Sequence, residues 1–231
     1  MSTSKTQIIA LGGGGFSDEP ENPLLDLYVL EQANVKIPKI CFLPTASGDA
    51  DSYLLKFYES FSKYECKPSH LSLFQPHTSE IQDFILSQDI VYVGGGNTKS
   101  MLALWKEWGL DLILKKAFEK GIVLAGISAG AICWFEEGAT DSIPGKISSL
   151  SCLGFVKGSC CPHYDGSELR RKTVPQLIQE KEMKAGYAID DNAAIHIVDN
   201  KLENVISSIK GKKVFFLDGH KIRDIPVKYL G

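Results

Sequence analysis

Short apolar runs alternate with longer amphipathic segments through the first half of the chain. Five runs, at positions 7–11, 39–43, 70–74, 89–93 and 122–124, are each followed within two residues by glycine or proline, as strands are where they meet a turn. The segments between them carry apolar residues at helical spacing. The expected helices span positions 22–33, 53–64, 79–86, 98–108 and 110–120, the last two separated by Gly109.

This order of elements predicts an α/β fold, with a mostly parallel sheet flanked by helices on both faces. Ligands of such sheets bind beyond the carboxyl ends of the strands. Segments 12–15, 44–47 and 94–98 and residue Ser128 all follow expected strands. We therefore expect them to meet at one edge of the sheet and to form the functional site there.

The second half of the chain has a different pattern. Positions 135–149 contain Gly, Ser and Pro and predict a loop with a short strand, 153–161 predict a strand, and 168–184 predict a helix despite Pro175. No repeat or linker divides the sequence, so we expect a single domain over residues 1–231. The strands of an expected C-terminal β meander span positions 193–198, 205–209 and 214–217.

Composition excludes several classes of function. A net charge of -3 gives no electrostatic basis for binding nucleic acid or an anionic membrane surface. No apolar stretch approaches the roughly 20 residues that span a bilayer, and positions 1–6 lack the apolar core of a secretory signal. The six cysteines form no C-x-x-C pair and no zinc spacing, so we expect reduced thiols, no metal and a cytoplasmic protein. The oligomeric state is left open.

One pentapeptide, Gly126-Ile127-Ser128-Ala129-Gly130, suggests covalent chemistry. A G-x-S-x-G segment between a strand and a helix is the pattern of a nucleophile elbow, a sharp turn that lifts the serine oxygen above the sheet. The turn also places the Ala129 N–H at a helix N-terminus, where it can face an oxyanion. The alternative is that these small residues only let a helix pack closely on a strand.

A serine nucleophile needs a base, and the base needs an orienting group. His163 is the candidate base among five histidines, because it follows an expected strand in a proline-fixed connection. For the acid, Asp141 gives the chain order Ser–Asp–His and Asp191 gives Ser–His–Asp. Asp165 lies too near His163 in sequence to be preferred. Each aspartate could instead cap a turn.

The glycine-rich segments have two interpretations. A glycine in segment 94–97 can present a second N–H to an oxyanion, or the segment can be a tight turn capped by Asn97 or Thr98. Segment 12–15 suggests a dinucleotide site, but Ser17 stands where G-x-G-x-x-G requires glycine. No phosphate-binding G-x-x-x-x-G-K-[ST] occurs either. We therefore expect no cofactor.

The chain resembles the dipeptidase E (aspartyl dipeptidase) family of serine peptidases. The resemblance covers nearly the whole chain, in order, and its motifs are Leu43-Pro44-Thr45-Ala46-Ser47, Gly94-Gly95-Gly96-Asn97-Thr98, Gly126-Ile127-Ser128-Ala129-Gly130-Ala131 and Pro162-His163-Tyr164-Asp165. It implies a class I glutamine amidotransferase-like fold with serine in place of the amidotransferase cysteine.

The resemblance also implies roles for residues. Ser128 would be the nucleophile and His163 the base, with Gly95 and Ala129 donating to the oxyanion. Both Asp141 and Asp191 match positions to which the family assigns an acid. We prefer Asp191 as the orienting acid, because it precedes a strand that should pack beside the elbow, and we expect Asp141 to shape the substrate pocket.

The best-known activity of that family is removal of N-terminal aspartate from dipeptides. An acidic side chain calls for a bidentate cation, and Arg170 and Arg171 follow His163 closely. We therefore expect a serine exopeptidase of small peptides, with aspartyl dipeptides as candidate substrates. The rival functions are a serine amidase or amidotransferase-like hydrolase of a non-peptide amide, and a catalytically inactive binding module.

Overall fold

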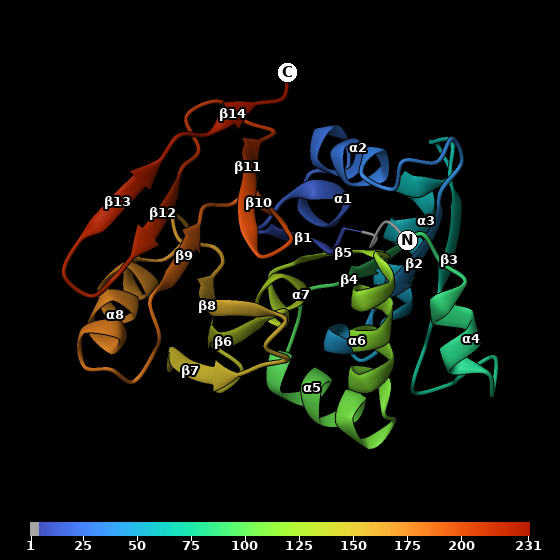
Figure 1. Cartoon of the computed structure of the whole chain (residues 1–231), viewed down its shortest axis with the longest axis horizontal. Coiled ribbons are helices and arrows are strands. Elements are labelled where there is room, and N and C mark those ends of the chain that lie inside the picture. The colour runs from blue at the N-terminus through green and yellow to red at the C-terminus, as the bar shows by residue number, and fades with distance from the viewer. Residues whose placement is uncertain (1–4) are drawn as a thin grey trace.

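The computed structural model describes residues 5–231, so most of the polar segment 1–6 lies outside the described residues. An eight-stranded sheet in the order β14-β11-β10-β1-β5-β4-β2-β3 forms the larger part of the molecule (Figure 1). Its five strands β1, β5, β4, β2 and β3 are parallel, as predicted. The strands span Gln7–Leu11 (β1), Lys39–Leu43 (β2), Lys67–His70 (β3), Ile90–Val93 (β4), Val123–Ile127 (β5), Ala193–Val198 (β10), Lys201–Ser207 (β11) and Lys228–Tyr229 (β14).

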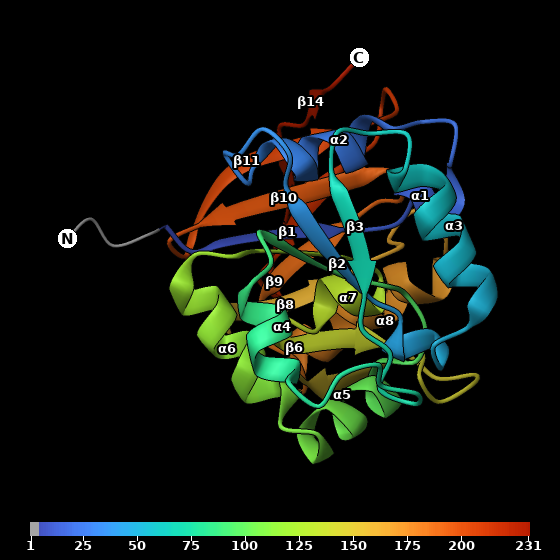
Figure 2. The same cartoon turned by 90° about the vertical axis from the view of Figure 1, so that its right-hand side faces the viewer.

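Helices cover both faces of this sheet, because successive strand residues point to opposite sides and both sides are apolar. In β1, Ile8 and Ala10 join one buried cluster while Ile9 and Leu11 join the other. Figure 2 views the layers from the β3 edge. One face carries α1 (Gly15–Asp18), α2 (Leu24–Glu31) and α3 (Asp51–Phe61), and the other carries α4 (Ile81–Leu86), α5 (Thr98–Glu107), α6 (Leu110–Lys120) and α7 (Ala129–Ile132).

A second, six-stranded sheet lies beside the first, on the left in Figure 1, in the order β13-β12-β9-β8-β6-β7. Helix α8 (Glu168–Gln179) packs on it through a small cluster that includes Val174 and Ile178. The C-terminal strands are divided between the sheets, since β10 and β11 extend the main sheet while β12 and β13 extend the second. The strands of the second sheet span Phe135–Thr140 (β6), Ser148–Ser151 (β7), Val156–Cys161 (β8), Gly186–Ile189 (β9), Val214–Leu217 (β12) and Ile222–Ile225 (β13).

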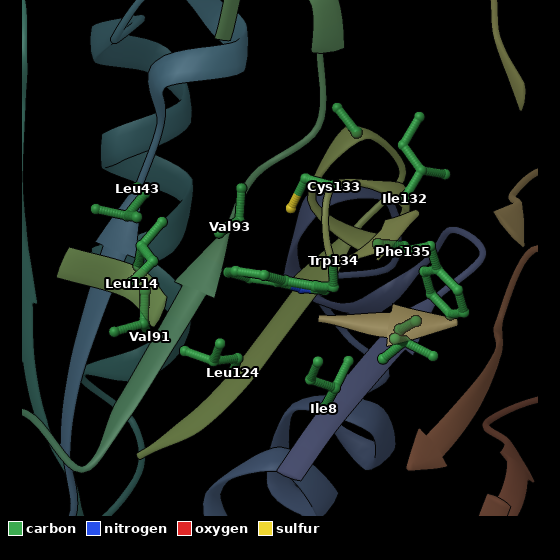
Figure 3. Packing of buried hydrophobic residues seen from close by; sticks show 14 of the residues in the cluster. Ile8, Leu43, Val91, Val93, Leu114, Leu124, Ile132, Cys133, Trp134 and Phe135 are labelled. Atoms are coloured by element: carbon green, nitrogen blue, oxygen red, sulfur yellow. The ribbon is translucent and has the colours of Figure 1, made fainter. Parts of the chain in front are cut away.

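The residues that follow the elbow connect the two sheets. Trp134 and Phe135 are fully buried and belong to the same cluster as Ile8 and Leu124 of the main sheet. Figure 3 shows the Trp134 ring extending toward Val93, with Phe135 pointing the other way. The chain therefore passes from the main sheet into the second sheet directly after the elbow helix α7.

The third strand is displaced from its predicted position. We expected it over positions 70–74, and β3 ends at His70. Leu71 and Leu73 are buried, which explains the apolar signal. The carboxylate Oδ2 of Asp49 accepts hydrogen bonds from the Leu73 and Phe74 N–H groups, so the backbone turns there instead of pairing. Helix α8 also ends earlier than expected, at Gln179 rather than near 184.

Candidate active site

The candidate nucleophile lies in a strained turn between β5 and α7. Ser128 has φ 56° and ψ −111°, a backbone conformation that non-glycine residues rarely adopt. A Cβ on Gly126 would overlap the carbonyl oxygen of Gly130, and a Cβ on Gly130 would overlap that of Val93. The two motif glycines are therefore required by close backbone approach, and they hold α7 tightly against the ends of β4 and β5.

Three predicted residues come together at the carboxyl end of β5. The Ser128 hydroxyl lies 2.8 Å from His163 Nε2, and His163 Nδ1 lies 2.5 Å from Asp191 Oδ1. His163 follows β8, and its own N–H donates to the carbonyl of Gly12 at 3.1 Å. The side chains of His163 and Asp191 are about one-third exposed, at 31% and 34%, so a substrate can reach this row of groups.

Asp191 contacts His163 as predicted, but the strand that follows Asp191 does not lie beside the elbow strand as we expected. It precedes β10, and β10 pairs with β1 rather than with the elbow strand β5. The Asp191 N–H donates to Asp165 Oδ1 at 2.8 Å, and Lys212 contacts the other oxygen of Asp165 at 2.6 Å. Burial raises the pKa of Asp165, but the Lys212 ammonium and the Asp191 N–H outweigh it and leave that pKa below its usual value.

The glycine run after β1 packs against the segment that carries Asp191. A Cβ on Gly12 would overlap the Asp190 carbonyl, and a Cβ on Gly13 would overlap the Asp191 carboxylate. The Asn192 N–H donates to the Gly13 carbonyl at 3.1 Å. In this structure the run therefore lets the acid-bearing segment approach β1 closely. Sequence reasoning missed this role, for which the only signal is an unexplained glycine run.

Ala129 and Gly95 flank Ser128. Helix α7 begins at Ala129. The Ala129 N–H is therefore at the helix N-terminus, where no carbonyl of a preceding helical turn accepts its hydrogen bond. A Cβ on Gly95 would lie 3.4 Å from the Ser128 Cβ. The Gly95 N–H donates to the hydroxyl of Tyr53 at 3.1 Å, a contact that nothing in the sequence pattern indicated.

Asp141 and Arg170 pair with each other beside the site. Arg170 is 5% exposed, and its Nη2 donates to Asp141 Oδ2 at 2.8 Å while Nη1 donates to the Ala139 carbonyl. Both line a cavity of about 440 Å³ that also includes His163 and Asp191. Asp141 is hydrogen-bonded to Arg170 in this structure, whereas Asp191 is hydrogen-bonded to His163.

The Arg171 side chain contacts Tyr164 and does not face the cavity beside His163. Its Nε donates to the Tyr164 carbonyl at 3.0 Å, and its guanidinium lies 5.7 Å from the centre of the Tyr164 ring. It is absent from the residues that line the cavity beside His163. Of the two arginines proposed to bind substrate, only Arg170 faces that cavity.

A larger cavity, of about 800 Å³, lies at the opposite end of the sheet. Its lining includes Gln7, Lys39 and Val123, each the first residue of its strand, so it lies away from Ser128. A smaller cavity of about 220 Å³ is lined by Tyr53, Ser128 and other residues around the elbow. Ser128, His163 and Asp191 therefore line the smaller cavities, which lie at the carboxyl ends of the strands.

The adjacent cysteines Cys160 and Cys161 are not activated as nucleophiles. Cys160 and Cys161 are buried, and burial raises the pKa of both thiols, that of Cys161 to about 11. They are therefore protonated near neutral pH and poor nucleophiles.

Within residues 5–231, no three His, Cys, Asp or Glu side chains are grouped so as to hold a metal ion. None of the helices in that range has the length and apolar character to cross a bilayer.

Comparison with known families identifies the chain. The model of peptidase family S51 matches residues 8–205. The chain belongs to family S51, the dipeptidase E family. Membership makes it a serine-type peptidase with peptide substrates, which confirms the enzyme class predicted from the motifs.

Relatives of this S51 peptidase match most of its length. It is 55% identical over 229 residues to the uncharacterized peptidase YgaJ of Bacillus subtilis (strain 168), with 97% of this chain and 99% of that protein covered. It is 23% identical to the uncharacterized peptidase Lmo0363 of Listeria monocytogenes, with 75% of this chain and 89% of that protein covered.

Solved structures share the fold of this S51 peptidase. A peptidase from an acI-B1 Actinobacterium superposes with a TM-score of 0.74 at 16% identity, covering 98% of this chain and 96% of that one. A putative peptidase E protein from Listeria monocytogenes EGD-e gives 0.64 at 21% identity, covering 87% and 98%. The class I glutamine amidotransferase-like fold is thereby confirmed.

Proposed function

We propose that this S51 peptidase is a serine exopeptidase of small peptides that uses a Ser128–His163–Asp191 triad. The observation that carries the proposal is the continuous row of hydrogen bonds, 2.8 Å from Ser128 to His163 and 2.5 Å from His163 to Asp191. This is the order of contacts by which an acid orients an imidazole and the imidazole activates a hydroxyl.

The proposed reaction has two halves. Ser128 Oγ attacks the peptide carbonyl carbon while His163 Nε2 takes the hydroxyl proton, and the tetrahedral intermediate collapses as His163 gives that proton to the leaving amine. Water then attacks the acyl-enzyme, His163 takes the proton of the water, and the same proton returns to Ser128 Oγ as the carboxylic acid leaves. Asp191 stabilises the imidazolium in both halves.

The oxyanion of each intermediate would be stabilised from two sides of Ser128. Ala129 contributes the N–H at the start of α7, and Gly95 lies next to the Ser128 side chain. Two preorganised donors aimed at one developing charge are the usual form of such a site. The proposal follows the family resemblance in assigning these two positions.

We expect the cavity beside His163 to bind substrates with an N-terminal aspartate. Arg170 is buried there, and a guanidinium has five N–H donors, of which Asp141, Ala139 and Cys161 engage three. The remaining donors can bind the carboxylate of a substrate side chain. We also expect the enzyme to act in the cytoplasm, where its six free thiols would stay reduced.

The test uses a fluorophosphonate probe and a library of dipeptides. We expect the probe to label the wild-type protein and Ser87→Ala, which removes an exposed hydroxyl on the far side of the fold, but not Ser128→Ala. We expect Ser128→Ala to lower kcat by about 10⁴–10⁶-fold. Labelling without cleavage of any dipeptide would favour an amidase of non-peptide amides, and no labelling would favour a binding module.

A further inference from the structure

The second oxyanion donor assigned by resemblance is already engaged in this structure. The Gly95 N–H donates to the Tyr53 hydroxyl at 3.1 Å. Tyr53, Gly95, Ser128 and His163 all line one cavity of about 220 Å³. The group that the Gly95 N–H contacts is therefore a phenol in the cavity of the nucleophile.

The hydrogen bond has only one possible direction. An amide N–H donates and cannot accept, so the Tyr53 oxygen is the acceptor and its own hydrogen is not used in this contact. Burial raises the pKa of Tyr53, although hydrogen bonds from Gly95 and Ser17 oppose the rise. The hydroxyl therefore keeps its proton near neutral pH and can donate it in a hydrogen bond.

The Tyr53 ring is held by its neighbours rather than free to swing. Its centroid lies 5.6 Å from that of Phe16 and 5.1 Å from that of Phe42. Its Cε1 lies so near Gly94 that a Cβ there would come within 2.8 Å. A donor fixed in this way loses little freedom when charge develops beside it, which is the property that makes oxyanion sites effective.

We propose that the Tyr53 hydroxyl donates a hydrogen bond to the oxyanion opposite the Ala129 N–H, and that Gly95 acts by orienting and polarising Tyr53. This inference rests on the proposed serine peptidase function and replaces Gly95 with Tyr53 as its second oxyanion donor. No proton is transferred from Tyr53, so the phenol is unchanged at the end of each cycle.

Tyr53→Phe removes the donor and keeps the ring. We expect kcat to fall by about 10²–10³-fold, the loss that follows removal of one oxyanion donor, with KM changed by less than about twofold. Tyr58→Phe is the matched control, because it removes a hydroxyl from the same helix that contacts His70 instead. We expect this control to retain wild-type kcat. Thermal unfolding shows whether each variant is folded.

A peptide boronate supplies a second measurement that a purely structural role would not change. It forms a tetrahedral adduct on serine, so its affinity for Tyr53→Phe should fall by a factor similar to kcat, while the affinity for a product amino acid should not. In a crystal structure of the wild-type adduct, we expect a boronate oxygen within hydrogen-bonding distance of the Tyr53 hydroxyl.

The outcomes separate this inference from the function on which it rests. If the wild-type protein neither reacts with a fluorophosphonate nor cleaves dipeptides, both are overturned. If the wild-type protein does both, and Tyr53→Phe either keeps wild-type kcat or changes only KM, the role of Tyr53 is overturned and the peptidase function stands. A boronate oxygen bonded to the Gly95 N–H, with Tyr53 displaced, would also overturn it.

Discussion

Gly13 lies so close to Asp191 that a Cβ atom at position 13 would overlap Oδ1, the carboxylate oxygen bonded to His163. We expect Gly13→Ala to push the carboxylate away from the imidazole, because the carboxylate is more free to move than the neighbouring backbone. The expected result is a fall in kcat of about 10–10³-fold without loss of the fold, measured by steady-state kinetics and thermal unfolding.

The control for Gly13→Ala is Gly48→Ala. Gly48 has φ 72° and open space around its Cα, so this substitution strains the backbone without touching the site. It should cost about 1 kcal/mol of stability and leave kcat unchanged. Equal activity of Gly13→Ala and the wild-type protein would mean that Asp191 does not need its present position.

The assignment of the orienting acid can be tested by a matched pair of variants. Asp191→Asn should lower kcat by about 10⁴-fold, because an amide at this position favours the wrong imidazole tautomer. Asp141→Asn should change kcat by less than about tenfold, since Asp141 contacts Arg170 rather than His163. The pair is compared by kcat on one dipeptide, and the reverse order of effects would assign the role to Asp141.

Substitutions of Arg170 and Arg171 should have different effects on substrate specificity. Arg170→Gln removes the cation that faces the cavity, so we expect KM for an aspartyl dipeptide to rise about 10–100-fold, the scale of one charged hydrogen bond. KM for an alanyl dipeptide should change much less. Arg171→Gln should leave both values near wild type, because its guanidinium contacts Tyr164. Equal effects of the two variants would contradict a role for Arg170 in recognition.

The stability of the protein should depend on pH through Asp26. Burial raises the pKa of this carboxyl from 3.8 to about 7, against an opposing hydrogen bond from Phe16. Between about pH 4 and pH 7 the folded protein holds a proton that the unfolded chain has released, so this contribution to stability is lost as the pH rises through that window. Above it both states are ionised, and no further loss follows.

Asp26→Asn isolates this effect, because asparagine does not ionise. We expect the free energy of unfolding of the variant, relative to the wild-type protein, to rise by roughly 3–4 kcal/mol between pH 4 and pH 8. His196 has its pKa lowered by burial from 6.5 to about 4 and titrates in the same range, but it is present in both proteins and cancels. Urea unfolding at each pH measures the difference, and a constant difference would contradict it.

Local patterns predicted most of the main sheet and its helices. Strands β1 and β2 and helix α6 have the predicted bounds, because apolar residues of a two-faced strand or an amphipathic helix are adjacent or periodic in the chain. The strand predicted at 70–74 was displaced, because burial of Leu71 and Leu73 looks the same in sequence whether the backbone pairs or turns around Asp49. Strands β9 and β13 were not predicted, because their sequences GYAI and IRDI lack the continuous run of large apolar residues that marks the equally short β4 and β12.

The sequence by itself determined that Ser128 lies at the end of a buried strand, since the strand, the turn and the helix that produce the elbow are contiguous in the chain. It also indicated His163 as its partner. Only the tertiary structure decided which aspartate bonds to His163, because Asp191 is 28 residues away and meets it across the glycine run after β1. The contact between Tyr53 and Gly95, 42 residues apart, was decided in the same way, by packing between elements that no local pattern records.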